Sequence, residues 1–232
     1  LFKLEGEDHS SKCLKLFKEI GVEHEIWDLE KLKEMIPIYS HDQYDGTTRP
    51  DEDDHFWDKT GKKIEGAVYT PGSGYVSDPQ LTSHNLQIAA EANGGDFIFN
   101  SEITEIRQQN GKVEGVTLKT GEQIDSPIVV NVAGPHSFVI NRMADVERDM
   151  NIKTRALRHE VHHVPSPEGY DFEKDGFHTS DGDNGIYFRP ETGNTILIGS
   201  EDPLCDPKEW ISDPDNYNQQ VTESQWKAQV YR

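Results

Sequence analysis

The spacing of apolar residues predicts five helices in this chain. In residues 9–20 the apolar side chains share one face of a helix, and charged side chains lie mostly on the opposite face. Asp78 followed by Pro79 is a typical helix start, because an aspartate caps the first turn and proline fits its backbone. The predicted helices cover residues 9–20, 29–35, 79–92 and 137–143, and a fifth begins at residue 222.

Runs of β-branched and aromatic residues predict the strands. Residues 128–132 form a near-continuous apolar run, interrupted only by Asn131, and such runs are typical of a parallel strand buried on both faces. Ala133, Gly134 and Pro135 then form a turn of small residues before a helix, where a phosphate or a flat ring can approach the backbone. The same turn also fits a tight connection that binds nothing. The other predicted strands are residues 22–26, 64–69, 97–99, 101–108, 113–118, 154–164, 186–189 and 195–200.

Polar segments separate these elements. Asn110 and Gly111 favour a tight hairpin turn, and residues 190–194 turn in a similar way between the last two strands. Residues 37–62 are polar and acidic, with four consecutive carboxylates at 51–54. Consecutive side chains point in different directions, and the glycine of a calcium loop is missing, so a solvated loop is expected there.

Composition and charge narrow the class of protein. The length of 232 residues suggests one large domain or two small ones. The formal net charge of −20 argues against binding to nucleic acids and to anionic membranes, and no apolar run is long enough for a membrane span. The chain starts at Leu1 without a signal peptide and without methionine, so we expect a piece of a longer protein. Cys13 and Cys205 have no metal or disulfide spacing, which favours the reducing cytoplasm.

Several segments together resemble one enzyme family. The apolar run followed by Asn131-x-Ala133-Gly134-Pro135 is similar to a flavin-contacting segment of the D-amino-acid oxidase superfamily. That superfamily includes sarcosine oxidase, glycine oxidase and dimethylglycine dehydrogenase. The other matching segments are residues 74–79 (Gly-Tyr-Val-Ser-Asp-Pro), 99–106, 110–116 and 185–199.

The resemblance implies a particular fold and division of the chain. We expect α/β plus α+β architecture, in which part of a Rossmann-like FAD-binding domain is interleaved with an antiparallel-sheet substrate domain. On this template, residues 1–76 are the first part of the substrate domain and residues 143–232 are its second part. Residues 77–142 are then the middle part of the FAD-binding domain.

The resemblance also implies positions that would contact FAD. The backbone of Ile103 matches the position at the adenine end of the cofactor. Ala133, Gly134, Pro135 and His136 match the second flavin-contacting segment, although His136 could also simply cap the helix that follows. The Gly-x-Gly-x-x-Gly phosphate motif that follows the first strand of a dinucleotide site is absent from the sequence. We therefore expect this chain alone to bind FAD weakly or not at all.

Arg189 and Tyr187 are the candidates for binding the substrate. The resemblance places their hairpin over the flavin, and arginine suits a substrate carboxylate because it donates two parallel hydrogen bonds. The family arginine often follows the hairpin proline, whereas Arg189 precedes Pro190. Arg189 also fits a strand residue paired with an acidic neighbour, and Tyr187 also fits core packing. The candidate acidic partners of Arg189 are Glu191 and Glu201.

Three histidines lie close together in the segment 154–164. His162 and His163 should point to opposite faces of a strand, and His159 and His163 would be about 13 Å apart, so we expect no metal site. A single histidine near the flavin, acting as a base or hydrogen-bond donor, is the alternative to a structural role. We select His159 as that candidate.

The function implied by the resemblance is oxidation of an amine or amino acid, such as an N-methylated glycine, with hydride transfer to FAD. Two alternatives stay open: a non-catalytic binding module, and an FAD-dependent dehydrogenase of a hydroxy substrate such as glycerol phosphate. The expected partners are a small-molecule substrate and an electron-acceptor protein, with no nucleic acid or membrane. Leu197 replaces a lysine that some members use, so the choice between oxygen and a carrier protein stays open.

Overall fold

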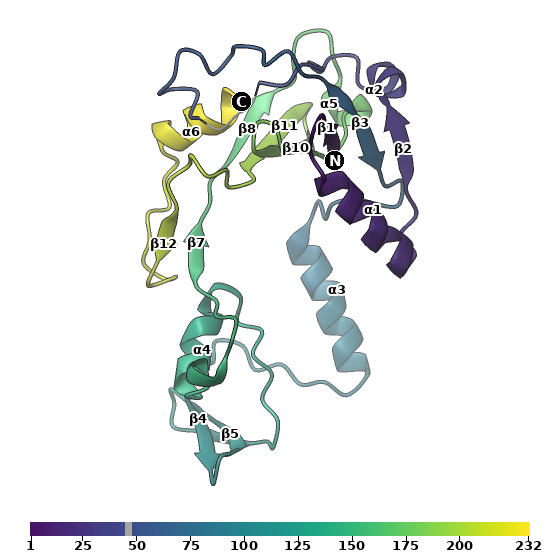
Figure 1. The fold of residues 1–232 in the computed structure, drawn as a ribbon. Helices are drawn as coiled ribbons and strands as arrows, with labels where there is room; N and C mark the ends of the chain where they lie inside the picture. Colours follow the sequence, from purple (N-terminus) through teal and green to yellow (C-terminus); the bar gives the residue numbers. More distant parts are fainter. Residues whose placement is uncertain (45–47) are drawn as a thin grey trace. The chain divides into compact units, whose positions relative to one another are not determined.

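The computed structural model describes residues 1–44 and 48–232, which form two compact units (Figure 1). The first unit comprises Leu1–Gly74, His159–Glu209 and Gln219–Arg232. The second comprises Tyr75–Arg158 and Trp210–Asn218. Residues 45–47 of the polar stretch expected at 37–62 lie outside the described residues. The assignment of substrate and cofactor roles to segments 1–76, 77–142 and 143–232 stays a prediction.

The first unit begins with a small antiparallel sheet in the order β1-β3-β2. The core beneath it contains Trp27 and the fully buried Leu32, and burying a leucine of this kind contributes about 1.5–3 kcal/mol. Asp28 caps the second helix by accepting a hydrogen bond from the Lys31 N–H at 2.8 Å, as its position in the sequence predicts. The elements are β1 (Phe2–Leu4), α1 (His9–Ile20), β2 (Glu25–Asp28), α2 (Leu29–Met35) and β3 (Ile64–Tyr69).

The larger part of the first unit is a four-stranded antiparallel sheet in the order β8-β11-β10-β9 (Figure 1). One face of this sheet is buried by aromatic packing. The ring of Phe188 lies 5.2 Å from that of Tyr39 and 6.2 Å from that of Phe172, measured between centroids. The elements are β8 (Val161–Pro165), α5 (Phe172–Asp175), β9 (Thr179–Asp181), β10 (Ile186–Glu191), β11 (Thr195–Ser200) and α6 (Glu223–Val230).

The segment expected as one strand at 154–164 is divided into β7 (Ala156–Arg158) and β8. The interruption falls at His159 and Glu160, because the buried Glu160 carboxylate turns toward the start of α6. It accepts hydrogen bonds from the Thr222 N–H at 2.9 Å and from the Thr222 hydroxyl at 2.8 Å. Residues 165–183 were expected to be loop, and the prediction was wrong for the part that forms α5 and β9.

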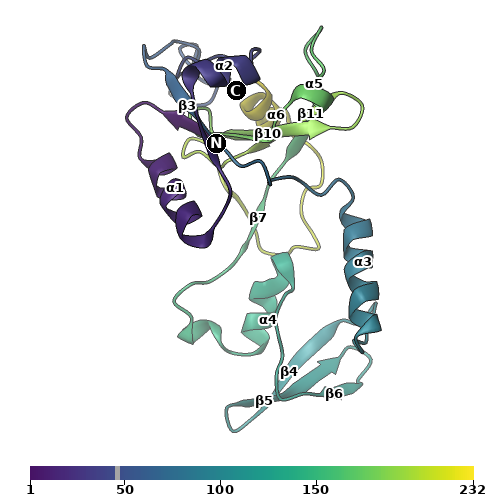
Figure 2. The same ribbon diagram turned by 90° about the vertical axis from the view of Figure 1, so that its right-hand side faces the viewer.

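The second unit contains helix α3 (Pro79–Ala92) and the antiparallel sheet β4-β5-β6 (Figure 2). Asn110 and Gly111 have φ angles of 50° and 74°, which confirms the predicted tight turn between β4 and β5. The remaining elements are β4 (Ile103–Gln109), β5 (Lys112–Leu118), β6 (Gln123–Asp125), η1 (Gly134–His136), α4 (Ser137–Met143), η2 (Glu147–Asp149) and β12 (Glu209–Ile211), which pairs with β7.

The prediction of a buried parallel strand at residues 128–132 was wrong. Ile128, Val130 and Val132 are 73%, 74% and 85% exposed, and no strand of the described chain pairs with this segment. A strand needs neighbours to satisfy its backbone groups, so an apolar sequence alone does not make one. The strand expected at residues 97–99 is absent from the structure for the same reason.

Candidate functional site

The face of the four-stranded sheet opposite the aromatic core is the candidate substrate face. Side chains alternate along β10, so Ile186 and Phe188 point to the core while Tyr187 and Arg189 point to the other face. Ile186 is buried, whereas Tyr187 and Arg189 are each partly exposed. The structure therefore brings the two predicted substrate residues together on one face, which we call the open face.

The ring of Tyr187 lies flat across Gly199 on the neighbouring strand β11. These two residues are direct partners in the β10–β11 register. A Cβ added at Gly199 would come within 2.3 Å of Tyr187 Cζ and Oη, so only glycine leaves room for this ring position. Gly199 is part of the family pattern noted in the sequence, but the sequence did not predict that this glycine would contact the ring of Tyr187.

Arg189 is held in place by acidic and backbone groups on its own strand. Its Nη1 atom lies 2.9 Å from Glu191 Oε2, and it donates a hydrogen bond of 2.9 Å to the Pro190 carbonyl. The Arg189 side chain is 16% exposed. The Thr192 backbone N–H, followed by the Arg189 guanidinium, holds the pKa of Glu191 below its usual range. Pairing with Glu191 was one of the two interpretations that the sequence left open.

His178 is a residue of the open face that sequence reasoning missed. It precedes β9, and its ring centroid lies 6.4 Å from that of Tyr187. Burial lowers the pKa of His178, and the positive charge of Arg189 lowers it further. The stretch around His178 was expected to be loop, so no strand periodicity could place its side chain.

The three histidines of segment 154–164 occupy different environments. His162 is 5% exposed on the core side, whereas His163 is exposed, which confirms that they point to opposite faces. Burial lowers the pKa of His162, and its Nε2 atom lies 3.8 Å from the nearest Glu160 carboxylate oxygen. His159 is exposed in the break between β7 and β8, and its role near a flavin stays a prediction. Within residues 1–44 and 48–232 no three His, Cys, Asp or Glu side chains are grouped to hold a metal ion.

In the second unit, Asn131 organises the turn that contains the candidate flavin contacts. Its Oδ1 atom accepts a hydrogen bond of 3.1 Å from the Ala133 N–H. Its Nδ2 atom donates to the Ser137 carbonyl at 2.9 Å and to Asn141 Oδ1 at 2.8 Å. The residue that seemed to interrupt an apolar strand is therefore the residue that shapes the following turn.

The predicted cofactor residues around this turn are accessible from solvent. Gly134 has a φ angle of +55°, and a Cβ added there would meet no atom within 4 Å among the described residues. His136 does not cap α4 with its side chain, and its Nε2 atom pairs with Asp215 Oδ1 at 3.1 Å. Ile103 is the first residue of β4, which lies at the edge of its three-stranded sheet.

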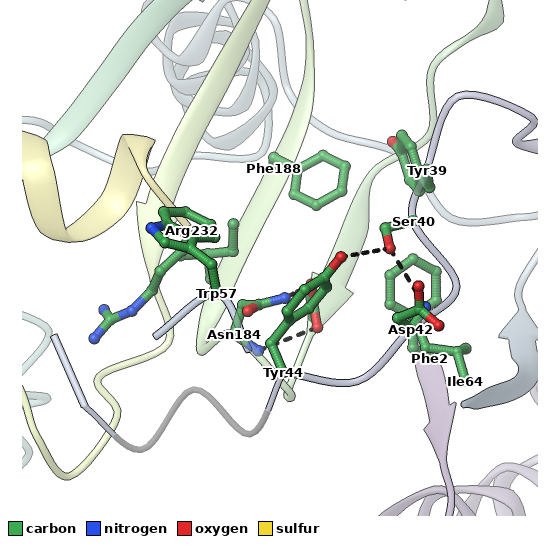
Figure 3. Close-up of a pocket in the computed structure, with 12 residues that line it drawn as sticks. Phe2, Tyr39, Ser40, Asp42, Tyr44, Trp57, Ile64, Asn184, Phe188 and Arg232 are labelled. Atoms are coloured by element: carbon green, nitrogen blue, oxygen red, sulfur yellow. Dashed lines mark hydrogen bonds between the residues drawn. The ribbon is translucent and has the colours of Figure 1, made fainter. Parts of the chain in front are cut away.

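A separate hollow of about 270 Å³ lies behind the four-stranded sheet (Figure 3). Aromatic rings, including those of Phe188 and Trp57, line it, and the Tyr44 hydroxyl lies 3.0 Å from Ser40 Oγ. Burial raises the pKa of the Asp181 carboxyl at its wall. The hollow borders the core side of β10, so it is distinct from the open face with Tyr187 and Arg189.

Comparison with known protein families identifies the family of this chain. Residues 5–228 match the family described as FAD dependent oxidoreductase (DAO). The chain belongs to this family. No curated protein sequence is similar enough to count as a match.

Three solved structures share the fold. The L-proline dehydrogenase from P. horikoshii has 17% identity and a TM-score of 0.67, over 99% of this chain and 53% of that one. The glycine oxidase from Bacillus cereus ATCC 14579 has 20% identity and a TM-score of 0.57, over 99% and 53%. The glycine oxidase from Geobacillus kaustophilus has 18% identity and a TM-score of 0.61, over 100% and 52%. The chain thus spans about half the length of these structures.

The residues present fit part of a cofactor site of this FAD-dependent family. Open space over Gly134 leaves the backbone of the Asn131-shaped turn accessible to a flat ring. The edge strand β4 presents the backbone of Ile103 at its start. In the described part of the chain, no helix has both the length and the apolar character needed to cross a membrane.

Proposed function

We propose that this chain supplies the substrate-binding sheet and part of the flavin contacts of an enzyme that oxidises a small amino acid, such as an N-methylated glycine. The observation that supports this most directly is Arg189 beside Tyr187 on the open face. Two of the structures that share the fold are named glycine oxidase and one is named proline dehydrogenase, and all three names refer to amino acids.

Arg189 would bind the substrate carboxylate. A guanidinium can donate two parallel hydrogen bonds to a carboxylate, which orients the substrate as well as holding it. Glu191 shows that a carboxylate oxygen is accommodated 2.9 Å from Arg189 Nη1. A substrate carboxylate would therefore compete with Glu191, or share the guanidinium with it.

Tyr187 would contact the remainder of the substrate. Its ring is fixed across Gly199, so it forms a flat apolar surface ending in a hydroxyl group. A small amino acid held by Arg189 would lie against this ring. The exposed His159 stays a candidate for a hydrogen bond near the flavin.

FAD, when bound, supplies the redox chemistry by accepting a hydride from the carbon next to the substrate nitrogen. Ile103, Ala133, Gly134, Pro135 and His136 are the proposed contacts of the chain with this cofactor. We propose that the 232-residue chain alone holds FAD weakly or not at all. A purified chain that retains the visible absorbance of a flavin would overturn that proposal.

The substrate proposal is tested by ligand binding to the purified chain. N-methylglycine, glycine and proline would be titrated and followed by two-dimensional NMR. Replacing Arg189→Gln should weaken binding of each ligand at least about tenfold, since the charge-assisted hydrogen bonds are lost. Arg148→Gln, an exposed arginine of the second unit, is the matched control and should bind like the wild type. Equal binding by Arg189→Gln and wild type would remove Arg189 from the site, and preferential binding of glycerol phosphate would favour a hydroxy substrate.

We also propose that the protein is located in the cytoplasm and that it passes electrons to an acceptor protein. Neither Cys13 nor Cys205 forms a disulfide within the described residues, which suits a reducing compartment. Fractionation of cells that produce the whole protein would test the location. Activity assays with oxygen and with artificial electron carriers would test the acceptor.

A further inference from the structure

We propose that His178 accepts the proton of the substrate ammonium group. This inference rests on the proposed function, because it assumes that Arg189 holds the carboxylate of the same amino acid. An amine can lose a hydride from its neighbouring carbon only when its nitrogen lone pair is available. The ammonium form that prevails near neutral pH must therefore lose a proton first.

The position of His178 follows from the register of the sheet. Thr179 pairs with Phe188, and Ser180 pairs with Tyr187. Continuing this antiparallel register by one residue places His178 across from Arg189 on the open face. The contact of its ring with Tyr187, at 6.4 Å between centroids and 60° between planes, confirms that the side chain points to that face.

The geometry of an amino acid makes this arrangement productive. One carbon separates the carboxylate from the nitrogen, so a carboxylate bound to Arg189 keeps the ammonium group near the guanidinium. Leu197 pairs with Arg189 on one side. On the other side the printed pairing ends at Phe188 and Thr179, and His178 is the next residue along from Thr179. Leu197 cannot accept a proton, and the Glu191 carboxylate is already engaged by the Arg189 guanidinium and the Thr192 N–H, which favours His178 as the base next to the anchor.

The charges around His178 favour the neutral ring. The groups near it are the phenol of Tyr187 and the Arg189 guanidinium, which is itself paired with the Glu191 carboxylate. Burial and the Arg189 cation lower the pKa of His178, so its imidazole is uncharged near neutral pH and has a lone pair to offer. In the transfer, an N–H bond of the substrate ammonium breaks and an N–H bond of the imidazolium forms. The electron pair of the broken bond stays on the substrate nitrogen.

Neither other candidate histidine has this position. His163 lies on β8 and pairs with Leu197 of β11, so a whole strand separates it from β10. His159 precedes β8, which β11 separates from β10. The proposal therefore assigns the proton to His178 and leaves His159 without that role.

The test compares two ligands across pH on the purified chain. N-methylglycine carries an ammonium group, whereas acetate has only the carboxylate. A protonated His178 repels an ammonium group, so the affinity for N-methylglycine should fall by about tenfold for each pH unit below the pKa of His178. The affinity for acetate should not fall over the part of this range in which acetate keeps its charge. NMR signals of the His178 ring would report both its titration and the binding.

His178→Asn should abolish the difference between the two ligands, because asparagine does not titrate. His55→Asn is the matched control, since His55 is an exposed histidine paired with Asp58 in a loop of the same unit. It should keep the wild-type dependence on pH. Should His178→Asn fail to fold, as judged by its NMR spectrum, His178→Gln replaces it.

Failure of the inference can be told apart from failure of the proposed function. If N-methylglycine binds through Arg189, but His178→Asn shows the same pH dependence as the wild type, the proton acceptor is not His178. If Arg189→Gln binds both ligands as the wild type does, the carboxylate site itself is wrong, and the role of His178 falls with it. Loss of the pH dependence only in the His178 variants supports the proposal.

Discussion

The carboxylate of Glu191 and the guanidinium of Arg189 form an ion pair, with Oε2 and Nη1 2.9 Å apart, on the open face of the four-stranded sheet. Their side chains are 19% and 16% exposed, so neither is freely solvated. The Glu191 Oε1 atom also accepts the Thr192 N–H at 2.9 Å, which fixes the carboxylate at the end of β10. The chain therefore keeps a carboxylate of its own beside the group proposed to bind the substrate.

Glu191→Gln should strengthen the binding of carboxylate ligands. Without its charge, the side chain at position 191 competes less with a ligand carboxylate for the Arg189 guanidinium, while its size is kept. We expect the Kd for acetate and for N-methylglycine to fall by about three- to tenfold, which corresponds to an ion pair of roughly 1 kcal/mol. NMR titration gives both constants. Glu122→Gln, at an exposed position of the second unit, serves as the control. Weaker binding by Glu191→Gln would contradict the idea that Glu191 competes with the ligand carboxylate for Arg189.

Gly199→Ala should displace the ring of Tyr187. The added Cβ would lie 2.3 Å from the ring, so the tyrosine must rotate away from the strand. We expect a loss of about 1 kcal/mol in the free energy of unfolding and changed ring signals for Tyr187 and His178. Chemical denaturation and NMR measure these effects. Gly182→Ala adds a Cβ with no atom closer than 3.8 Å, and it should leave both rings unchanged.

Asn131→Ala should loosen the turn proposed to contact FAD. The substitution removes the hydrogen bonds to the Ala133 N–H, the Ser137 carbonyl and Asn141. We expect the Ala133 amide to exchange with solvent faster and the second unit to lose about 1–2 kcal/mol of stability. Hydrogen exchange followed by NMR provides the measurement. Asn85→Ala on the exposed surface of α3 is the control, and equal exchange in both variants would show that Asn131 does not hold the turn.

Protonation of His162 should contribute to acid destabilisation of the first unit. Burial lowers the pKa of His162 in the folded chain, so the unfolded chain binds the proton more tightly. The wild type should therefore lose stability as the pH falls below the unfolded histidine pKa of about 6.5, down to the folded pKa. His162→Gln should show a shallower loss between pH 7 and 5 than the wild type. Parallel denaturation curves for the two proteins across this range would rule out the contribution.

Short-range signals in the sequence were sufficient for most of the elements. Asp28 and Asp78 cap α2 and α3 through bonds to backbone groups three residues away, and Asn110-Gly111 makes its hairpin turn with its own two φ angles. The hairpin with Tyr187 and Arg189 follows from alternation and turn residues in one continuous segment. Each of these features depends on residues that are neighbours in the chain, which is why the sequence alone predicts them.

Partners that are distant in the chain were decided only by the tertiary structure. Glu160 ends a predicted strand because it bonds to Thr222, 62 residues away. His178 becomes part of the candidate site because β9 forms beside β10, in a stretch that has no strand pattern of its own.

Residues 128–132 show the reverse case. They carry the apolar pattern of a buried strand, yet they remain exposed because no described strand pairs with them. The sequence by itself determined where the chain turns, caps its helices and alternates its side chains. Packing and hydrogen bonds between segments that are distant in the sequence decided which faces of the helices and strands contact one another.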